Sequence, residues 1–172
     1  MLGIVIAAVS GGDDDSAKVS SGGTSESSDS KNEAGGGVDF KGKTGKDTGA
    51  NAGETITQKN ISITTTPLQT QHPDYQAPQL CTTITVKNDG DKQKAFNMFD
   101  WKMQDPNGAA KSGMPPLDNS GSGFNSGELA PGGQITGDLC FDGDPSAVPG
   151  QYVVLYQGSI LSSDRLGWVN QL

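Results

Sequence analysis

The chain has 172 residues and a formal net charge of −8. It has no cluster of Lys and Arg, which excludes the electrostatic footprint of a protein that binds nucleic acid or an anionic membrane surface. Residues 1–37 contain no aromatic residue, and sixteen of them are Ser or Gly. This part lacks the apolar surface that would offset its ordering entropy, so we predict a disordered tail. The remaining stretch of about 130 residues suffices for one hydrophobic core.

The first nine residues are apolar and give way abruptly to an acidic Gly/Ser sequence. A helix of this length would rise about 14 Å, against a hydrocarbon core of about 30 Å. We therefore interpret 1–10 as the remnant of a longer signal or anchor segment and 11–53 as a disordered Gly/Ser/Asp-rich linker. Ala8-Val9-Ser10 resembles a cleavage site, which would release the protein; otherwise the segment is an anchor. A genuine short start that packs against the domain is the alternative.

From residue 54 onward, short apolar runs alternate with turn signals at 88–91, 105–108 and 130–133, where Asn, Asp, Gly and Pro gather. No window keeps the apolar period of a helix. We predict an all-β fold over 54–172, an antiparallel β-sandwich of about seven strands. The strand-like runs are 56–66, 80–86, 99–104, 135–141, 151–156 and 165–172.

The patterns of two of these runs predict which side chains are buried. Phe99, Trp101 and Met103 share one face of their run, as core residues of a strand would. The run 151–156 is apolar on both faces, which predicts a central strand that is covered on both sides. Trp101 and Trp168 are interpreted as core aromatics rather than ligand platforms.

Cys81 and Cys140 each alternate with the apolar residues of their strands, so both are predicted to point away from the core. A disulfide between neighbouring strands, on the outer surface of a sheet, explains this placement in a protein that matures outside the cytosol. The alternative is a pair of reduced surface thiols.

Several segments of the chain together resemble a known family. They are Leu80-Cys-Thr-Thr-Ile-Thr-Val-Lys-Asn-Asp-Gly-Asp, then Phe99-Asp-Trp-Lys-Met-Gln-Asp-Pro-Asn-Gly, then Gly127-Glu-Leu-Ala-Pro-Gly-Gly, and a similar ending from Tyr152 to Trp168. The family is the telokin-like, immunoglobulin-fold domain of unknown function of secreted or membrane-anchored actinobacterial proteins, related to the mycobacterial immunoprotective extracellular antigens. The match covers about residues 54–170. It implies an immunoglobulin-like sandwich without known catalytic residues, in which Cys81 and Cys140 fall on neighbouring second and fifth strands.

Little in the chain suggests catalysis or a cofactor. His72 is the only histidine, and no Ser lies in a nucleophile elbow, so we expect no enzyme and interpret His72 as a solvated loop residue. A hydrolase would have to pair His72 with a serine. The turns at 89–91 and 142–144 place two Asp residues around a Gly, as calcium loops do, but neither continues to a distal Glu. We predict no metal site and no cofactor.

Two long loops are the candidate recognition surfaces, because loops on a rigid sandwich usually carry binding. The first, 66–79, contains His72 and Tyr75; the second, 112–126, contains Met114, Leu117 and Phe124. The apolar side chains of the second loop could dock on a partner or cap the sandwich, and for Phe124 capping is favoured. We expect a non-enzymatic extracellular or cell-surface module, binding an unknown protein or envelope component. The alternative is a small-ligand or calcium-binding carrier or sensor. We expect the protein to contact the membrane only through an N-terminal anchor, if that anchor is retained.

Overall fold

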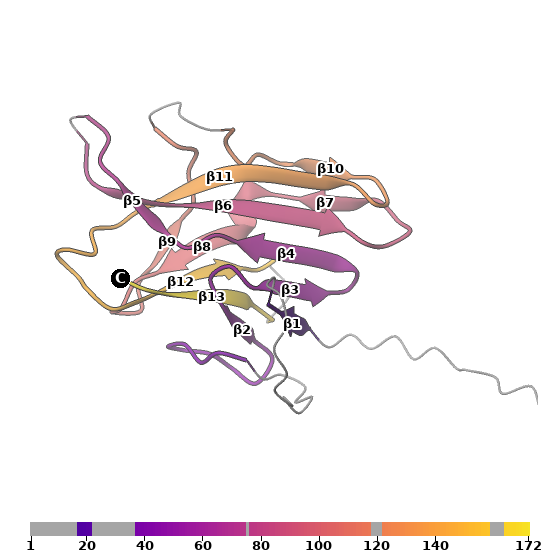
Figure 1. Cartoon of the computed structure of the whole chain (residues 1–172), viewed down its shortest axis with the longest axis horizontal. Helices are drawn as coiled ribbons and strands as arrows, with labels where there is room; N and C mark the ends of the chain where they lie inside the picture. The colour runs from indigo at the N-terminus through magenta and orange to yellow at the C-terminus, as the bar shows by residue number, and fades with distance from the viewer. Residues whose placement is uncertain (1–16, 22–36, 75, 118–121, 159–163) are drawn as a thin grey trace, which may run out of the picture.

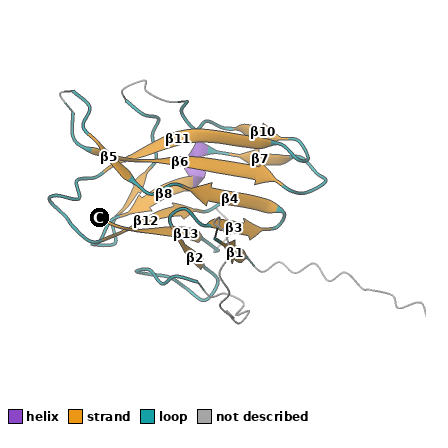
Figure 2. Ribbon diagram, in the orientation of Figure 1, coloured by secondary structure: helices purple, strands orange, loops and turns teal. Residues whose placement is uncertain are grey.

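The computed structural model describes residues 17–21, 37–74, 76–117, 122–158 and 164–172. They form two packed sheets of short strands with one 3₁₀ turn, η1 (Met98–Asp100) (Figures 1 and 2). The first sheet contains, in spatial order, β1 (Lys18–Ser20), β3 (Thr55–Gln58), β4 (Ile61–Thr65), β6 (Gln79–Asn88) and β11 (Gln134–Asp142), and β5 (Gln69–Gln71) also pairs with β6.

The second sheet contains, in spatial order, β2 (Thr48–Asn51), β13 (Leu166–Gln171), β12 (Gln151–Tyr156), β8 (Trp101–Gln104) and β9 (Ala110–Ser112). A separate pair is formed by β7 (Lys94–Phe96) and β10 (Gly127–Leu129). The neighbours are antiparallel except that β13 pairs with β2 in parallel. The predicted all-β sandwich is thus confirmed, with more short edge strands in the described residues than the sequence indicates.

The core between the sheets is built around aromatic side chains. Trp101 and Trp168 are 1% and 0% exposed, and their rings stack with centroids 5.8 Å apart. Tyr156 lies 4.9 Å from the Trp101 ring, and Phe124 meets the same ring edge-on at 5.9 Å. The interpretation of both tryptophans as core residues is confirmed.

Two predicted runs have a different local structure. The run 56–66 is a hairpin of β3 and β4, because Lys59 and Asn60 adopt positive φ angles of 49° and 61°, as a tight two-residue turn requires. In the run 99–104, only 101–104 is a strand. Phe99 lies in η1, where its backbone amide donates a hydrogen bond to the Asn97 side chain. Phe99 itself is 73% exposed.

The predicted linker extends too far toward the domain. Phe40 packs with Val153, Leu155 and Val169 on the outer face of the second sheet, and β2 joins the edge of that sheet. Residues 37–53 therefore belong to the folded unit. They provide the second cover that the apolar run of β12 predicts. Lys18–Ser20 also pairs with β3.

The predicted remnant at 1–10 and most of the tail lie outside the described residues. Within the described part of the chain, the one helical element is far shorter than a membrane span requires.

Candidate functional site

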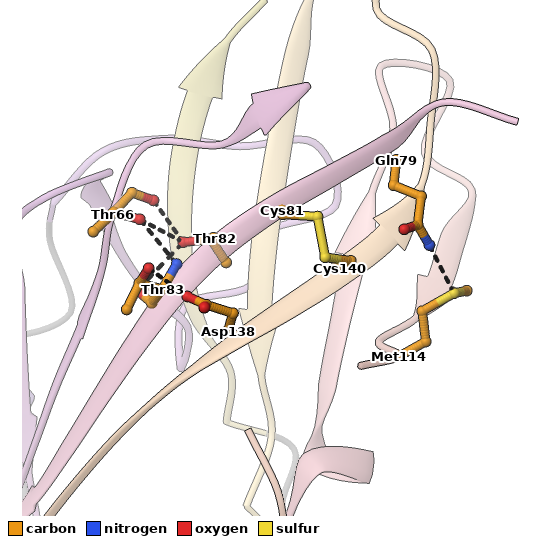
Figure 3. Close-up of a disulfide and its surroundings, with 8 residues drawn as sticks. All are labelled: Thr66, Gln79, Cys81, Thr82, Thr83, Met114, Asp138 and Cys140. Carbon is orange, nitrogen blue, oxygen red and sulfur yellow. Dashed lines mark hydrogen bonds between the residues drawn. A yellow bond between two sulfur atoms is a disulfide. The ribbon is translucent and has the colours of Figure 1, made fainter. Parts of the chain in front are cut away.

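The disulfide between Cys81 and Cys140 joins β6 to β11, at positions that face each other directly in the register of the two strands (Figure 3). The same face carries two further cross-strand pairs: the Thr83 hydroxyl donates to Asp138 at 2.6 Å, and the hydroxyls of Thr85 and Thr136 are 3.0 Å apart. The predicted bridge between neighbouring strands is present.

Neither cysteine belongs to the core cluster between the sheets, so both face away from it as predicted, but the bridge is not exposed on the surface. Cys81 is 5% exposed and Cys140 is 0% exposed. The reason is that neither cysteine lies at a sheet edge: β5 runs beside Cys81 through Gln69, and the chain at Met114 exchanges two backbone hydrogen bonds with Cys140. A buried disulfide flanked on both sides is shielded from solvent reductants.

The loop that follows β4 is tied firmly to this disulfide region. The Thr82 hydroxyl donates to the Thr66 carbonyl at 2.7 Å, and the Thr83 amide donates to the Thr66 hydroxyl at 2.9 Å (Figure 3). Leu68 is buried, and its amide donates to the Asn170 side chain at 2.9 Å. The base of this loop is therefore rigid, although its tip is exposed.

Several loops gather at one end of the sandwich, because the strand register places Gln79, Gln104, Asp142 and Gln151 at the same end. The Gly143 amide donates to the Pro78 carbonyl at 3.3 Å, which links two of these loops. We call residues 72–78, 114–117 and 142–146 the loop cluster. Tyr75 lies outside the described residues.

Gln79 lies beneath the loop cluster and is fully buried. Its amide nitrogen approaches the Met114 sulfur at 3.1 Å, so the two side chains point toward each other (Figure 3). Its amide oxygen has no hydrogen-bond partner among the described residues, and neither has that of Gln71, the neighbour of Gln79 across β5 and β6. A buried oxygen without a partner costs about 1–3 kcal/mol. The sequence gives no signal for this feature.

The surface of the loop cluster is acidic. Asp74 and Asp142 are exposed, and Asp144 is half-buried. A hydrogen bond from the Ser146 hydroxyl holds the pKa of Asp144 below its usual range against the effect of burial, with a smaller contribution from the charge of His72. In the same region, burial raises the pKa of Tyr152, with a further contribution from Asp105 and Asp144.

The predicted interaction residues fall in different environments. His72 is exposed, Leu117 is 44% exposed and Met114 is half-buried against Gln79. These three residues belong to the loop cluster.

Phe124 does not belong to a docking surface, because it is 0% exposed and packs edge-on against Phe96 and Trp101. Gly137 makes room for it: a Cβ there would lie 2.8 Å from the Phe124 Cα. A glycine between Ile135 and Leu139 on the inner face of β11 is the sequence signal for this packing.

The two Asp-Gly-Asp turns have structural partners. Asp89 accepts hydrogen bonds from Lys87 and Ser62, which hold its pKa below the usual range. The Asp144 carboxylate caps the Ser146 amide at 3.0 Å. In the described part of the chain, no group of three or more His, Cys, Asp or Glu side chains is arranged to hold a metal ion.

Comparison with known proteins gives a family match. Residues 50–166 match the model of a family described as a domain of unknown function, DUF4352. No curated protein sequence matches the chain.

Three solved structures are similar to the chain at low sequence identity, and the first two have TM-scores above 0.5. The YjhA protein of Bacillus subtilis is 15% identical, with a TM-score of 0.55, over 71% of this chain and 98% of that one. YcdA of Bacillus subtilis, a candidate lipoprotein, is 16% identical with a TM-score of 0.56 over 68% of this chain, which spans 38% of YcdA. The secreted protein MPT63 of Mycobacterium tuberculosis is 15% identical with a TM-score of 0.46, over 66% of this chain and 82% of that one.

Proposed function

We propose that this chain, which belongs to the DUF4352 family, is a non-enzymatic extracellular or cell-surface module that binds a protein or envelope component through its loop cluster. The observation that carries the proposal is the combination of a rigid base and an exposed rim. The base consists of the disulfide and the Thr66 hydrogen bonds, and the rim holds Leu117 and His72. Recognition loops on rigid scaffolds have this construction.

The proposed location rests on the disulfide, since such bonds persist in oxidising compartments and are rare in the cytosol. The candidate lipoprotein YcdA shares the fold, which fits a module displayed at the cell envelope. In this proposal the acidic Gly/Ser tail is a tether, and the domain is telokin-like, related to the mycobacterial immunoprotective extracellular antigens.

The partner is proposed to present an apolar contact for Leu117 and polar or basic groups for the surrounding carboxylates. Leu117 is an exposed large apolar side chain, and the loop cluster also contains the exposed Asp142 and the half-buried Asp144. An apolar anchor with a polar rim is the usual composition of an interface core and its surroundings.

The test begins with cross-linking of the full oxidised chain in the native host's envelope fraction, followed by identification of the captured component. Its affinity is then measured for the wild type, Leu117→Asp and Phe99→Asp. We expect Leu117→Asp to weaken binding at least about tenfold, because a charge replaces the apolar anchor. Phe99→Asp is the matched control, an equally drastic change at a residue beyond the opposite end of β8. An affinity that falls only in the control would reject the loop cluster as the site.

A second candidate function, a small-ligand carrier, is favoured by one feature: a cleft of about 280 Å³ between the sheets. A carrier would be stabilised by its ligand, which raises the melting temperature of the folded state.

A further inference from the structure

The cleft lies away from the loop cluster, beside the turn between β3 and β4. Its apolar walls come from both sheets: Ile61 and Ile63 of β4 on one side, and Tyr156 and Leu166 of β12 and β13 on the other. Its volume of about 280 Å³ is close to the lower limit of about 300 Å³ for small-molecule sites. The cleft therefore has room for one short apolar chain.

Two lysines line this cleft. Lys59 is exposed in the β3–β4 turn, and Lys94 is half-buried at the start of β7. Neither has a hydrogen bond or ion pair through its ammonium group within the described residues. Asp164 also lines the cleft, so the lining side chains carry one net positive charge.

A third polar group is the hydroxyl of Tyr156. It lies directly over Gly158, where an added Cβ would overlap it, and Gly158 also lines the cleft. The hydroxyl has no hydrogen-bond partner within the described residues. Burial, together with the charge of Asp100, raises the pKa of Tyr156 to about 12. The phenol is therefore protonated at neutral pH and can donate a hydrogen bond to an anion.

We propose that this cleft binds a small single-chain organic anion, with its apolar chain between Ile61, Ile63 and Leu166 and its carboxylate near Lys59, Lys94 and Tyr156. Charge complementarity selects the headgroup, because a carboxylate would gain two ammonium groups and a phenol donor. The volume selects a free short-chain acid over a two-chain lipid. This site is separate from the loop cluster and does not depend on its proposed role.

Binding can be measured with octanoate as the probe. The Trp101 ring lies 4.9 Å from the Tyr156 ring, so a ligand that contacts Tyr156 changes the environment of a natural fluorophore. We expect saturable changes in tryptophan fluorescence and in the heat of titration with octanoate. Octanol, which has the same chain without the charge, should bind several-fold more weakly, and octylamine more weakly still. The affinity for octanoate should also fall with added salt.

Three substitutions test the assigned groups. Lys59→Gln and Lys94→Gln should each weaken octanoate binding about two- to fivefold, as expected for partly exposed charge pairs. Tyr156→Phe keeps the ring packing and removes the hydroxyl, so it should weaken binding about tenfold. The matched control is Lys111→Gln, at an exposed lysine of β9 outside the cleft.

Circular dichroism and the urea midpoint of each variant establish that the fold is retained. The proposal is supported if the three cleft variants lose affinity for octanoate and retain the weak affinity for octanol. It is overturned if octanoate binds no better than octanol, or if the cleft variants behave like Lys111→Gln. Failure of this test leaves the loop-cluster proposal intact, because the two experiments use different residues and different ligands.

Discussion

Asp47 and Arg165 form an ion pair across 118 residues of sequence, with a distance of 2.7 Å between Oδ2 and Nη2. Asp47 is completely buried, and it also accepts hydrogen bonds from the Arg165 amide and from the amide and hydroxyl of Thr44. Arg165 in turn lies over the Phe40 ring. This pair fastens the segment before β2 to the start of β13.

Removal of this carboxylate should destabilise the domain and change its response to acid. Burial acts to raise the pKa of Asp47, but the hydrogen bonds from Arg165 and Thr44 outweigh it and hold the pKa below 3.8. Its stabilisation is then fully present above about pH 4 and is lost as the pH falls through the lowered value. Asp47→Asn should lower the free energy of unfolding at pH 7 by about 3 kcal/mol.

The measurement is urea unfolding of the wild type and Asp47→Asn at pH 7, 4 and 3. The difference between the two proteins should shrink at the lowest pH. A constant difference over the whole range would show that the charge of Asp47 is not what stabilises the fold. Asp39→Asn is a control, since Asp39 is exposed in the same segment.

The folded unit is predicted to begin before β2. A chain that begins at residue 37 should retain the cooperative unfolding of the full chain. A chain that begins at residue 54 should be less stable, because it exposes Val153, Leu155 and Val169 and leaves Arg165 without Asp47. Thermal unfolding followed by circular dichroism distinguishes the two chains. Equal stability of both would place residues 37–53 outside the unit.

Gly49→Ala tests the same contact in the full chain. A Cβ at this position would overlap the carbonyl oxygen of Val38, so the segment 37–47 must move away. Trypsin should then cleave faster after Lys41, Lys43 and Lys46 than in the wild type. Gly45→Ala is the control, because a Cβ there meets nothing within 4 Å.

The disulfide is expected to stabilise the sandwich without determining its strand pairing. The bridge spans 59 residues, for which the chain-entropy model gives about 4 kcal/mol. Replacement of Cys81 and Cys140 by Ala should lower the free energy of unfolding by up to that amount, as measured by urea titration. The far-ultraviolet spectrum should be unchanged, since nine residue pairs hold β6 against β11. Loss of the β spectrum would show that the register needs the bridge.

Gln79→Leu should separate stability from recognition. The substitution removes a buried amide oxygen that has no partner among the described residues, so the protein should be as stable as the wild type or more stable by about 1 kcal/mol. Melting temperatures measure this effect. If the oxygen instead belongs to the recognition machinery, affinity for the captured envelope component should fall although stability does not. A strongly destabilised variant would mean that the weak contact with Met114 matters more than the desolvated oxygen.

The sequence predicts the strands whose residues alternate regularly. The run at β6, the run at β11 and the pairing of Cys81 with Cys140 all follow from period-two patterns and are present in the structure. The apolar character of β12 on both faces also predicts a covered strand correctly. The sequence does not indicate that Phe40 covers the outer face of β12, because Phe40 is a single aromatic residue in a Gly- and Lys-rich stretch.

The candidate site was predicted less well, for physical reasons. Alternation tells which face of a strand a cysteine occupies, but burial depends on the neighbours of that strand, here β5 and the chain at Met114. Phe124 caps the core, as the sequence favours, and Gly137 leaves room for it; the glycine signals a close approach, but which residue approaches is set by tertiary packing. The Asp47–Arg165 pair and the cleft at Tyr156 are also products of tertiary packing.

The parallel pairing of β2 with β13 has a consequence for the order in which the domain can assemble. Thr48 aligns with Leu166, so β2, near the beginning of the fold, cannot pair until β13 has been synthesised. During synthesis from the amino end, the first sheet can close as soon as β11 has emerged, but the second sheet stays incomplete until β13 has emerged. Contacts of such long sequence separation form slowly. A nascent chain in which β12 has emerged from the ribosome but β13 has not would therefore have β2 still without its partner strand.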